Sequence, residues 1–205
     1  SLHKRIQGSY ASIALISGHG LLAFRDPFGI RPLVIGKRFS STTKKEEWMV
    51  ASESLVLENN DYQVVRDVDP GEAIFINING DFFSKQCSEN SMLCPCAFEY
   101  VYLARPDSIM NGISVYKARL KMGDYLSESI KKTINSGDVD VVMPIPDSSR
   151  PAAMQVARQL GIEYREGFFK NRYVGRTFIM PGQQKRKKSV RQKLNAMSTE
   201  FKNKN

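Results

Sequence analysis

The sequence is poor in the residues that build metal centres and disulfide scaffolds. It holds two histidines, His3 and His19, and three cysteines, Cys87, Cys94 and Cys96. Three cysteines cannot pair completely among themselves, and the 205 residues contain no secretory signal and no apolar run of transmembrane length. We therefore expect a protein of the reducing cytoplasm.

Several chemical motifs are also missing. Cys94-Pro95-Cys96 could be half of a metal or iron–sulfur site, but no second Cys or His pair accompanies it. The sequence has no phosphate-cradling P-loop, no dinucleotide fingerprint and no Ser/His/Asp triad. Zinc and iron–sulfur centres are therefore left unassigned.

Acidic residues are scarce near the C-terminal end of the chain, where basic residues are dense. From Lys170 onward there are eleven Lys and Arg residues and one acid, Glu200, which accounts for nearly all of the formal net charge of +9. This asymmetry leaves four alternatives open: a nucleic-acid arm, a membrane-binding arm, a site for a small phosphorylated molecule, and a solvated tail.

The overall composition is that of an ordinary soluble globular protein, with 41% hydrophobic and 25% charged residues. The length fits one or two domains. The chain begins at Ser1 without Met and ends at Asn205 in a polar stretch. We expect it to be a piece of a longer protein.

Short apolar runs joined by turn residues predict an antiparallel sheet, with helices in another layer, over roughly the first ninety residues. The expected strands are residues 10–16 and 21–25, which form a hairpin, and residues 33–37, 48–51 and 72–78. DPFGIRPL, which carries two prolines and a glycine, is expected to be an ordered loop between strands.

After Cys96 the pattern changes to that of a parallel α/β domain. Apolar residues recur every three or four positions over residues 114–134, which predicts a helix with one buried face. A β-branched run at residues 138–143 and a helix at residues 152–160 follow. This order is typical of a parallel sheet, and we place the boundary between the halves within residues 79–98.

The loop PIPDSSR follows the predicted strand. Ligands of open α/β sheets bind at the carboxyl ends of the strands, so Asp147, Ser148 and Ser149 lie where a phosphate, a ribose or its magnesium ion is expected. Ser148 or Ser149 could instead cap a helix that begins near Arg150. The two roles are compatible, because a helix N-terminus also attracts anions.

Arg105 lies in YLARPDS, directly after a predicted apolar strand that Pro106 ends. Its guanidinium could bind a phosphate through two parallel hydrogen bonds. It could equally form an ion pair with Asp107 or another nearby carboxylate.

The basic stretch from Lys170 to Leu194 reads KNRYVGRTFIMPGQQKRKKSVRQKL. A nucleic-acid interface is expected to present a regular basic helix or interleaved aromatic residues. Gly175, Pro181 and Gly182 are predicted to break any helix, and two aromatic residues are too few for a stacking platform. A mobile loop that closes over a polyphosphate uses the same residues, which favours a small phosphorylated ligand.

Four segments, FRDPFGIRPL, FEYVYLARPDS, PIPDSSR and the basic stretch, closely resemble the amidophosphoribosyltransferase family, most nearly its proteobacterial form. The similarity runs along almost the whole chain. This family joins an N-terminal-nucleophile glutaminase sandwich to a type I phosphoribosyltransferase domain, a fold class of α/β and α+β. The resemblance implies that residues 1–90 are the C-terminal part of the class II glutamine amidotransferase domain, and residues 91–205 the N-terminal part of the phosphoribosyltransferase domain.

The resemblance also implies a reaction, the first committed step of de novo purine (IMP) biosynthesis. Glutamine, phosphoribosyl pyrophosphate and water give 5-phosphoribosylamine, glutamate and pyrophosphate, with ammonia passing internally between the two domains. Members use Mg²⁺, form homo-oligomers and are inhibited by purine nucleotides. The family implies neither a nucleic-acid partner nor a membrane.

The family's motifs assign roles to particular residues of this chain. Ser148 corresponds to the magnesium-binding hydroxyl. The residues implied to lie closest to the chemistry are Lys170, Arg172 and Tyr173, and those implied to bind substrate are Arg105, Asp147, Ser149 and Arg176.

The chain departs from the family pattern in two places. The family's glutaminase nucleophile is an N-terminal cysteine, whereas this chain is expected to begin at Ser1 well inside that domain, and none of Cys87, Cys94 and Cys96 is in the right place to replace it. The acidic pair and Gly/Thr loop of the phosphoribosyltransferase signature would follow Asn205. Cys96 coincides with an iron–sulfur ligand of some members, but no cluster is assigned. We expect the intact protein to be the enzyme and this chain alone to be inactive; the alternatives are a degenerate relative lacking one activity and a basic nucleic-acid-binding module.

Overall fold

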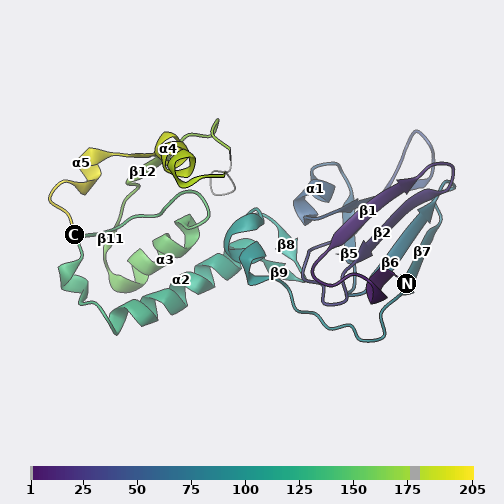
Figure 1. Ribbon diagram of the computed structural model, residues 1–205, viewed down its shortest axis with the longest axis horizontal. Helices are drawn as coiled ribbons and strands as arrows, with labels where there is room; N and C mark the ends of the chain where they lie inside the picture. The colour runs from purple at the N-terminus through teal and green to yellow at the C-terminus, as the bar shows by residue number, and fades with distance from the viewer. Residues whose placement is uncertain (1, 176–180) are drawn as a thin grey trace. The chain divides into compact units, whose positions relative to one another are not determined.

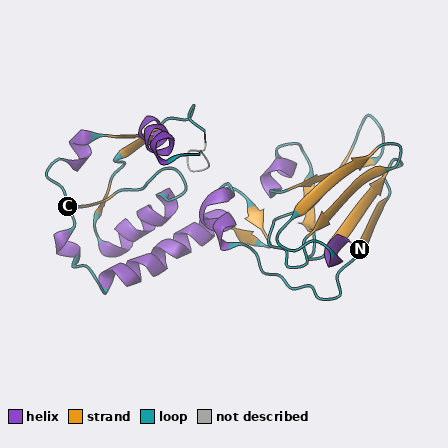
Figure 2. Cartoon of the chain, in the orientation of Figure 1, coloured by secondary structure: helices purple, strands orange, loops and turns teal. Residues whose placement is uncertain are grey.

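The computed structural model describes residues 2–175 and 181–205. The chain divides into two compact units, Ser1–Val115 and Tyr116–Asn205 (Figure 1). The first unit consists mainly of strands and the second mainly of helices (Figure 2). This division does not identify either unit by family, so the assignment of residues 1–90 and 91–205 to the two enzyme domains stays a prediction.

Two antiparallel sheets form the first unit, one with strand order β1-β2-β6-β7 and the other with order β4-β3-β5. The strands are β1 (Ala11–Ile16), β2 (Gly20–Arg25), β3 (Val34–Phe39), β4 (Glu46–Ala51), β5 (Gln63–Asp67), β6 (Glu72–Asn77) and β7 (Phe82–Gln86). β1 and β2 pair from Ala11 with Arg25 to Ile16 with Gly20, which confirms the predicted hairpin.

The core of this unit lies between the two sheets. Ala23 of β2, Ile74 of β6 and Ile35 of β3 belong to one buried apolar cluster. At its edge Trp48 of β4 stacks on Phe82 of β7, with the ring centroids 4.7 Å apart. Because each sheet contributes one apolar face, the unit is a β-sandwich.

A short helix, α1 (Ser54–Glu58), covers the other face of the second sheet. Val34 of β3 and Leu57 of α1 are buried together in a separate cluster. Successive side chains of a strand point to opposite faces, so Val34 packs toward α1 while Ile35 packs into the sandwich. The first half of β3 is thus buried on both faces, which explains its apolar start.

The loop DPFGIRPL is ordered, as the sequence predicts. The Asp26 carboxylate, which is fully buried, accepts hydrogen bonds from the backbone N–H groups of Phe28, Ile30 and Arg31 at 3.0 to 3.1 Å. The neighbouring Arg25 is also buried and donates to three backbone carbonyls at 2.7 to 2.8 Å. Two buried side chains therefore satisfy the polar backbone of this turn.

The predicted apolar strand before Arg105 is wrong. Residues Glu99–Leu103 form a short π-helix, η2, and the two-residue strands β8 (Ile109–Met110) and β9 (Ile113–Ser114) follow. The N–H of Ala104 donates to the carbonyl of Glu99, five residues earlier, at 2.9 Å. A short apolar run does not reveal its period, so the sequence could not separate helix from strand here.

The second unit begins with a parallel α/β arrangement, as predicted. Its elements are α2 (Val115–Lys131), the 3₁₀ helix η3 (Ser136–Asp138), β10 (Val141–Val142), α3 (Arg150–Leu160) and β11 (Glu163–Tyr164). β10 and β11 pair in parallel, and α2 and α3 lie side by side (Figure 1). The strand predicted over residues 138–143 is therefore shorter than expected.

The basic stretch contains a helix that the sequence did not predict. β12 (Phe168–Lys170) and β13 (Leu194–Ala196) pair antiparallel, and α4 (Gln183–Lys193) precedes β13, which α5 (Ser198–Phe201) follows. Gly175, Pro181 and Gly182 all lie before α4, so they delimit the helix and do not prevent it. α4 carries six cations and no acid. Within the described ranges no helix has the length and apolarity needed to cross a lipid bilayer.

Candidate active site

The clearest polar site of the second unit is an ion pair between Asp147 and Lys170. Asp147 lies in the loop between β10 and α3, at the carboxyl end of the parallel strand, and Lys170 is the last residue of β12. The Lys170 ammonium donates a short hydrogen bond to Asp147 Oδ2. Two residues that the sequence proposes for substrate handling, 23 positions apart, are thus in direct contact.

The charges around Asp147 keep it ionised. Partial burial by itself would raise the pKa of Asp147, but the hydrogen bond and charge of Lys170, and the charges of Arg150 and Arg172, outweigh burial and lower the pKa. A carboxylate held in this way stabilises neighbouring cations without acting as a proton donor near neutral pH. The cluster is therefore built to hold positive charge in place.

Three further side chains complete the cluster. Arg150, at the start of α3, donates from Nη1 to Asp147 Oδ1 and from Nε to Glu166 Oε1, each at 2.9 Å. Tyr164 Oη donates to the same Glu166 oxygen at 2.8 Å. The sequence did not single out these three residues as site candidates, although Arg150 directly follows the PDSS motif.

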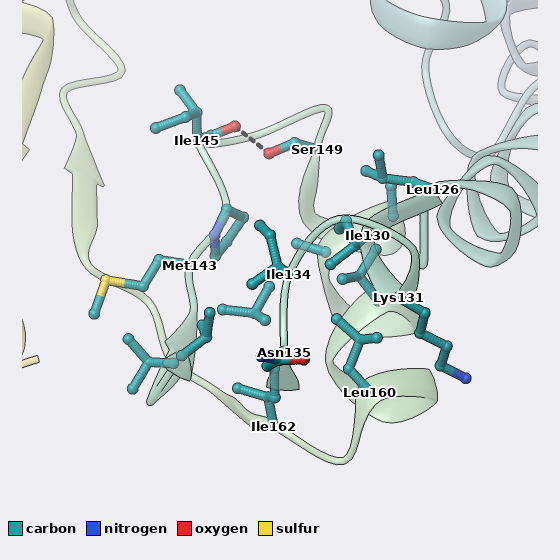
Figure 3. Close-up of a pocket in the computed structure, with 17 residues that line it drawn as sticks. Leu126, Ile130, Lys131, Ile134, Asn135, Met143, Ile145, Ser149, Leu160 and Ile162 are labelled. Atoms are coloured by element: carbon teal, nitrogen blue, oxygen red, sulfur yellow. Dashed lines mark hydrogen bonds between the residues drawn. The ribbon is translucent and has the colours of Figure 1, made fainter. Parts of the chain in front are cut away.

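Neither serine of the loop makes the side-chain hydrogen bond to α3 that the capping prediction requires. Ser149 is the N-cap residue of α3, but its hydroxyl accepts no hydrogen bond from the N–H groups of the helix and donates instead to the carbonyl of Ile145 at 2.5 Å (Figure 3). The backbone carbonyl of Ser149 accepts the N–H of Ala153. Ser148 is half-buried beside Asp147. The Ser149 side chain therefore does not cap α3.

A cavity of about 570 Å³ lies next to the loop between β10 and α3 and is lined mainly by apolar side chains. Leu126 and Ile130 from α2, Leu160 from α3 and Ile162 line it together with Ile145 (Figure 3). An apolar wall cannot replace the hydration of a phosphate. We therefore locate the polar chemistry at the Asp147–Lys170 cluster and not in this cavity.

The structure describes two of the other three candidates of the basic stretch, and both are exposed. Arg172 is exposed, and its charge contributes to the lowered pKa of Asp147. The Tyr173 side chain is 99% exposed and points to solvent. A backbone hydrogen bond from the Asn171 N–H to the Lys193 carbonyl, at 2.7 Å, joins the two ends of this segment. Arg176 lies outside the described residues.

Arg105 belongs to the first unit and forms the ion pair that the sequence left open. Its Nε and Nη2 donate to the two oxygens of Asp107 at 3.1 and 2.8 Å. The N–H of Arg105 donates to Glu53 Oε2 at 2.9 Å, and the Ser108 hydroxyl donates to the same oxygen at 2.6 Å. The turn that presents Arg105 is thus tied to the residue before α1.

The described residues contain no group of three or more His, Cys, Asp or Glu side chains that could hold a metal ion. The three cysteines are free thiols. Asp147, the residue before Ser148, already pairs with two cations. Any divalent ion there would need most of its oxygen ligands from a bound phosphate or from water.

Comparison with known proteins identifies close relatives over the full chain. Amidophosphoribosyltransferases of Pseudomonas aeruginosa and Escherichia coli are 55% and 56% identical over 204 and 203 residues, covering 100% and 99% of this chain. The Saccharomyces cerevisiae amidophosphoribosyltransferase is 49% identical over 206 residues. The chain spans about 40% of the length of each of these relatives. No protein-family model matches it.

A solved structure agrees with the sequence comparison. The glutamine phosphoribosylpyrophosphate amidotransferase from B. subtilis, complexed with ADP and GMP, superposes with a TM-score of 0.75 and 37% identity. The match covers 96% of this chain and 40% of that one. The chain is therefore homologous over its whole length to amidophosphoribosyltransferases, which confirms the family resemblance and the mixed α/β fold class.

Proposed function

We propose that this chain is part of an amidophosphoribosyltransferase that uses glutamine and phosphoribosyl pyrophosphate to make 5-phosphoribosylamine, glutamate and pyrophosphate. The observation that carries the proposal is the 55–56% identity over 99–100% of the chain. This reaction is the first committed step of de novo purine biosynthesis. The cytoplasm is the expected location.

The charge cluster of the second unit supplies a physical reason for this reaction. As pyrophosphate leaves C1 of the ribose, negative charge grows on its oxygens, and cations fixed near that point lower the barrier. We propose this role for Lys170, which lies at the end of β12 and pairs with Asp147, and for Arg172, whose charge also acts on Asp147. Tyr173, Ser149 and Arg176 are proposed as further contacts, and Arg105 as a substrate or signalling residue of the first unit.

We assign Mg²⁺ to the substrate and not to a preformed protein site. A magnesium ion keeps several waters and binds through phosphates and few protein oxygens, which fits a loop that offers the Ser148 hydroxyl. Glutamine, purine nucleotides as feedback inhibitors, and further copies of the same chain are the proposed partners. An iron–sulfur cluster is not assigned.

The test is an assay of the intact protein and of this 205-residue chain with phosphoribosyl pyrophosphate, Mg²⁺ and glutamine. The proposal predicts that the intact protein releases pyrophosphate and glutamate together, and that the chain alone releases neither. Release of only one product by the intact protein would identify a degenerate relative. Binding of α4 to nucleic acid that falls steeply with salt and does not compete with phosphoribosyl pyrophosphate would favour the nucleic-acid alternative.

A further inference from the structure

A continuous network of polar contacts leads from Tyr164 to Lys170 through Glu166, Arg150 and Asp147. Glu166 Oε1 accepts hydrogen bonds from Tyr164 Oη at 2.8 Å and from Arg150 Nε at 2.9 Å. Arg150 Nη1 then donates to one oxygen of Asp147 at 2.9 Å, and the Lys170 ammonium donates to the other. The five side chains come from α3, β12 and the segments that flank them.

Glu166 binds its partners in this network through only one of its two carboxylate oxygens. Tyr164 and Arg150 both bind one of its oxygens, while the second oxygen, Oε2, is buried and has no hydrogen-bond partner in the part of the chain that the structure describes. Burial raises the pKa of Tyr164 to about 12, together with its hydrogen bond to Glu166 and the charge of that carboxylate. The phenol therefore remains a donor throughout the physiological pH range.

The guanidinium of Arg150 is shared between two carboxylates, Asp147 and Glu166. Its planar fork could bind either carboxylate with two parallel hydrogen bonds, and that arrangement is stronger than a single contact. Without Glu166 we expect Arg150 to turn toward Asp147 and to neutralise it more completely. The attraction between Asp147 and Lys170 would then weaken, and the ammonium would sample more positions.

We propose that Glu166 is a positioning residue for the phosphoribosyl transfer: it holds Arg150, Arg150 fixes Asp147, and Asp147 keeps the Lys170 ammonium in one place until substrate phosphates take it over. The proposal rests on the function proposed above. Fixing a cation before the reaction removes the cost of reorganising it while charge develops on the leaving group. Glu166 therefore acts on the rate through Lys170 without touching the substrate.

The experiment compares the intact protein with its Glu166→Gln variant, which keeps the side-chain shape but removes the charge. Pyrophosphate release is measured with ammonium chloride as the nitrogen donor, so that the glutaminase reaction does not limit the rate. We expect kcat to fall by about tenfold, with a smaller change in the KM for phosphoribosyl pyrophosphate. The matched control is Glu163→Gln, which removes the partner of Arg165 at 3.0 Å and should leave kcat within about twofold of wild type.

A double-mutant cycle of Glu166→Gln with Lys170→Ala distinguishes a positioning role of Glu166 from a general loss of structure. If Glu166 acts through Lys170, adding Glu166→Gln to Lys170→Ala lowers kcat little further, whereas a purely structural effect is multiplied onto that of Lys170→Ala. Multiplicative effects, or an unchanged kcat in Glu166→Gln alone, overturn the positioning role and leave the proposed function intact. Wild-type kcat in Lys170→Ala overturns both the proposed site and this inference.

Discussion

Glu72 of β6 is a buried carboxylate whose ionisation stabilises the first unit. It is 3% exposed and accepts two hydrogen bonds from Arg66, at 2.6 and 2.7 Å, and one from the Asp69 N–H at 2.7 Å. Ser84 donates a further bond at 2.5 Å. Burial by itself would raise the pKa of Glu72, but these hydrogen bonds and the charge of Arg66 lower it from its ordinary value of 4.5.

This lowered pKa predicts a pH-dependent stability. The ionised carboxylate stabilises the fold at pH values above the ordinary 4.5, and the contribution is lost as the pH falls through the lower folded-state pKa. Glu72→Gln should therefore lower the free energy of unfolding near neutral pH, and the difference from wild type should shrink in acid. Urea unfolding at several pH values measures this. Glu58→Gln, at the exposed end of α1, is the control. If Glu72→Gln lowered the free energy of unfolding equally at every pH, the lowered pKa assigned to Glu72 would be contradicted.

At the same scale, the sequence predicted candidate residues better than their pairings. The motif PDSS and the basic stretch singled out Asp147 and Lys170, which the structure brings together. Glu166 carried no recognisable signal, because its importance comes from contacts with Arg150 and Tyr164 that depend on how the chain folds back. The ion pair of Arg105 with Asp107 was one of two alternatives that local spacing could not separate.

At the scale of elements, α2 and α3 approach each other closely at Gly123. A Cβ atom there would lie 2.6 Å from the carbonyl oxygen of Ala152 and 2.8 Å from Cβ of Gln155. Gln155 and Gln159 also donate to Asp124 Oδ1 at 2.7 and 3.0 Å, which joins the helices beside the glycine. The missing side chain therefore sets the distance between the helices.

Gly123→Ala tests this packing because two effects oppose each other. Alanine favours a helix over glycine by about 1 kcal/mol, whereas overpacking against a rigid backbone typically costs about 1 to 3 kcal/mol. We expect the clash to prevail and the variant to unfold at a lower urea concentration. Gly137→Ala, where nothing lies within 4 Å of the added Cβ, serves as the control. A Gly123→Ala protein more stable than wild type would refute the close contact.

Whether an element could be predicted depended on its length and periodicity. The long helix α2 and the hairpin β1–β2 have clear patterns and were found within a few residues. The strands β5 and β7 and the helix α1 were missed, because they are five residues long and are fixed by packing on their neighbours. The helix α4 has no apolar face, so no hydrophobic periodicity could reveal it.

At the scale of the whole molecule, the family was easier to predict from the sequence than the arrangement of the chain. The motifs indicated the family, and the full-length matches at 55–56% identity agree with it. Composition and spacing alone pointed only to a phosphate-handling α/β protein. The two compact units divide at Val115, a boundary that depends on contacts and has no mark in the sequence.

The central claim is that the Lys170 cluster serves transfer from phosphoribosyl pyrophosphate, and the most direct test is the kcat of the intact Lys170→Ala variant. Lys202→Ala, at an exposed position of the same unit, is the control. With saturating phosphoribosyl pyrophosphate and ammonium chloride, the account predicts that Lys170→Ala lowers the rate of pyrophosphate release about 100-fold or more, while Lys202→Ala does not change it. A Lys170→Ala variant that turns over at the wild-type rate would contradict the account.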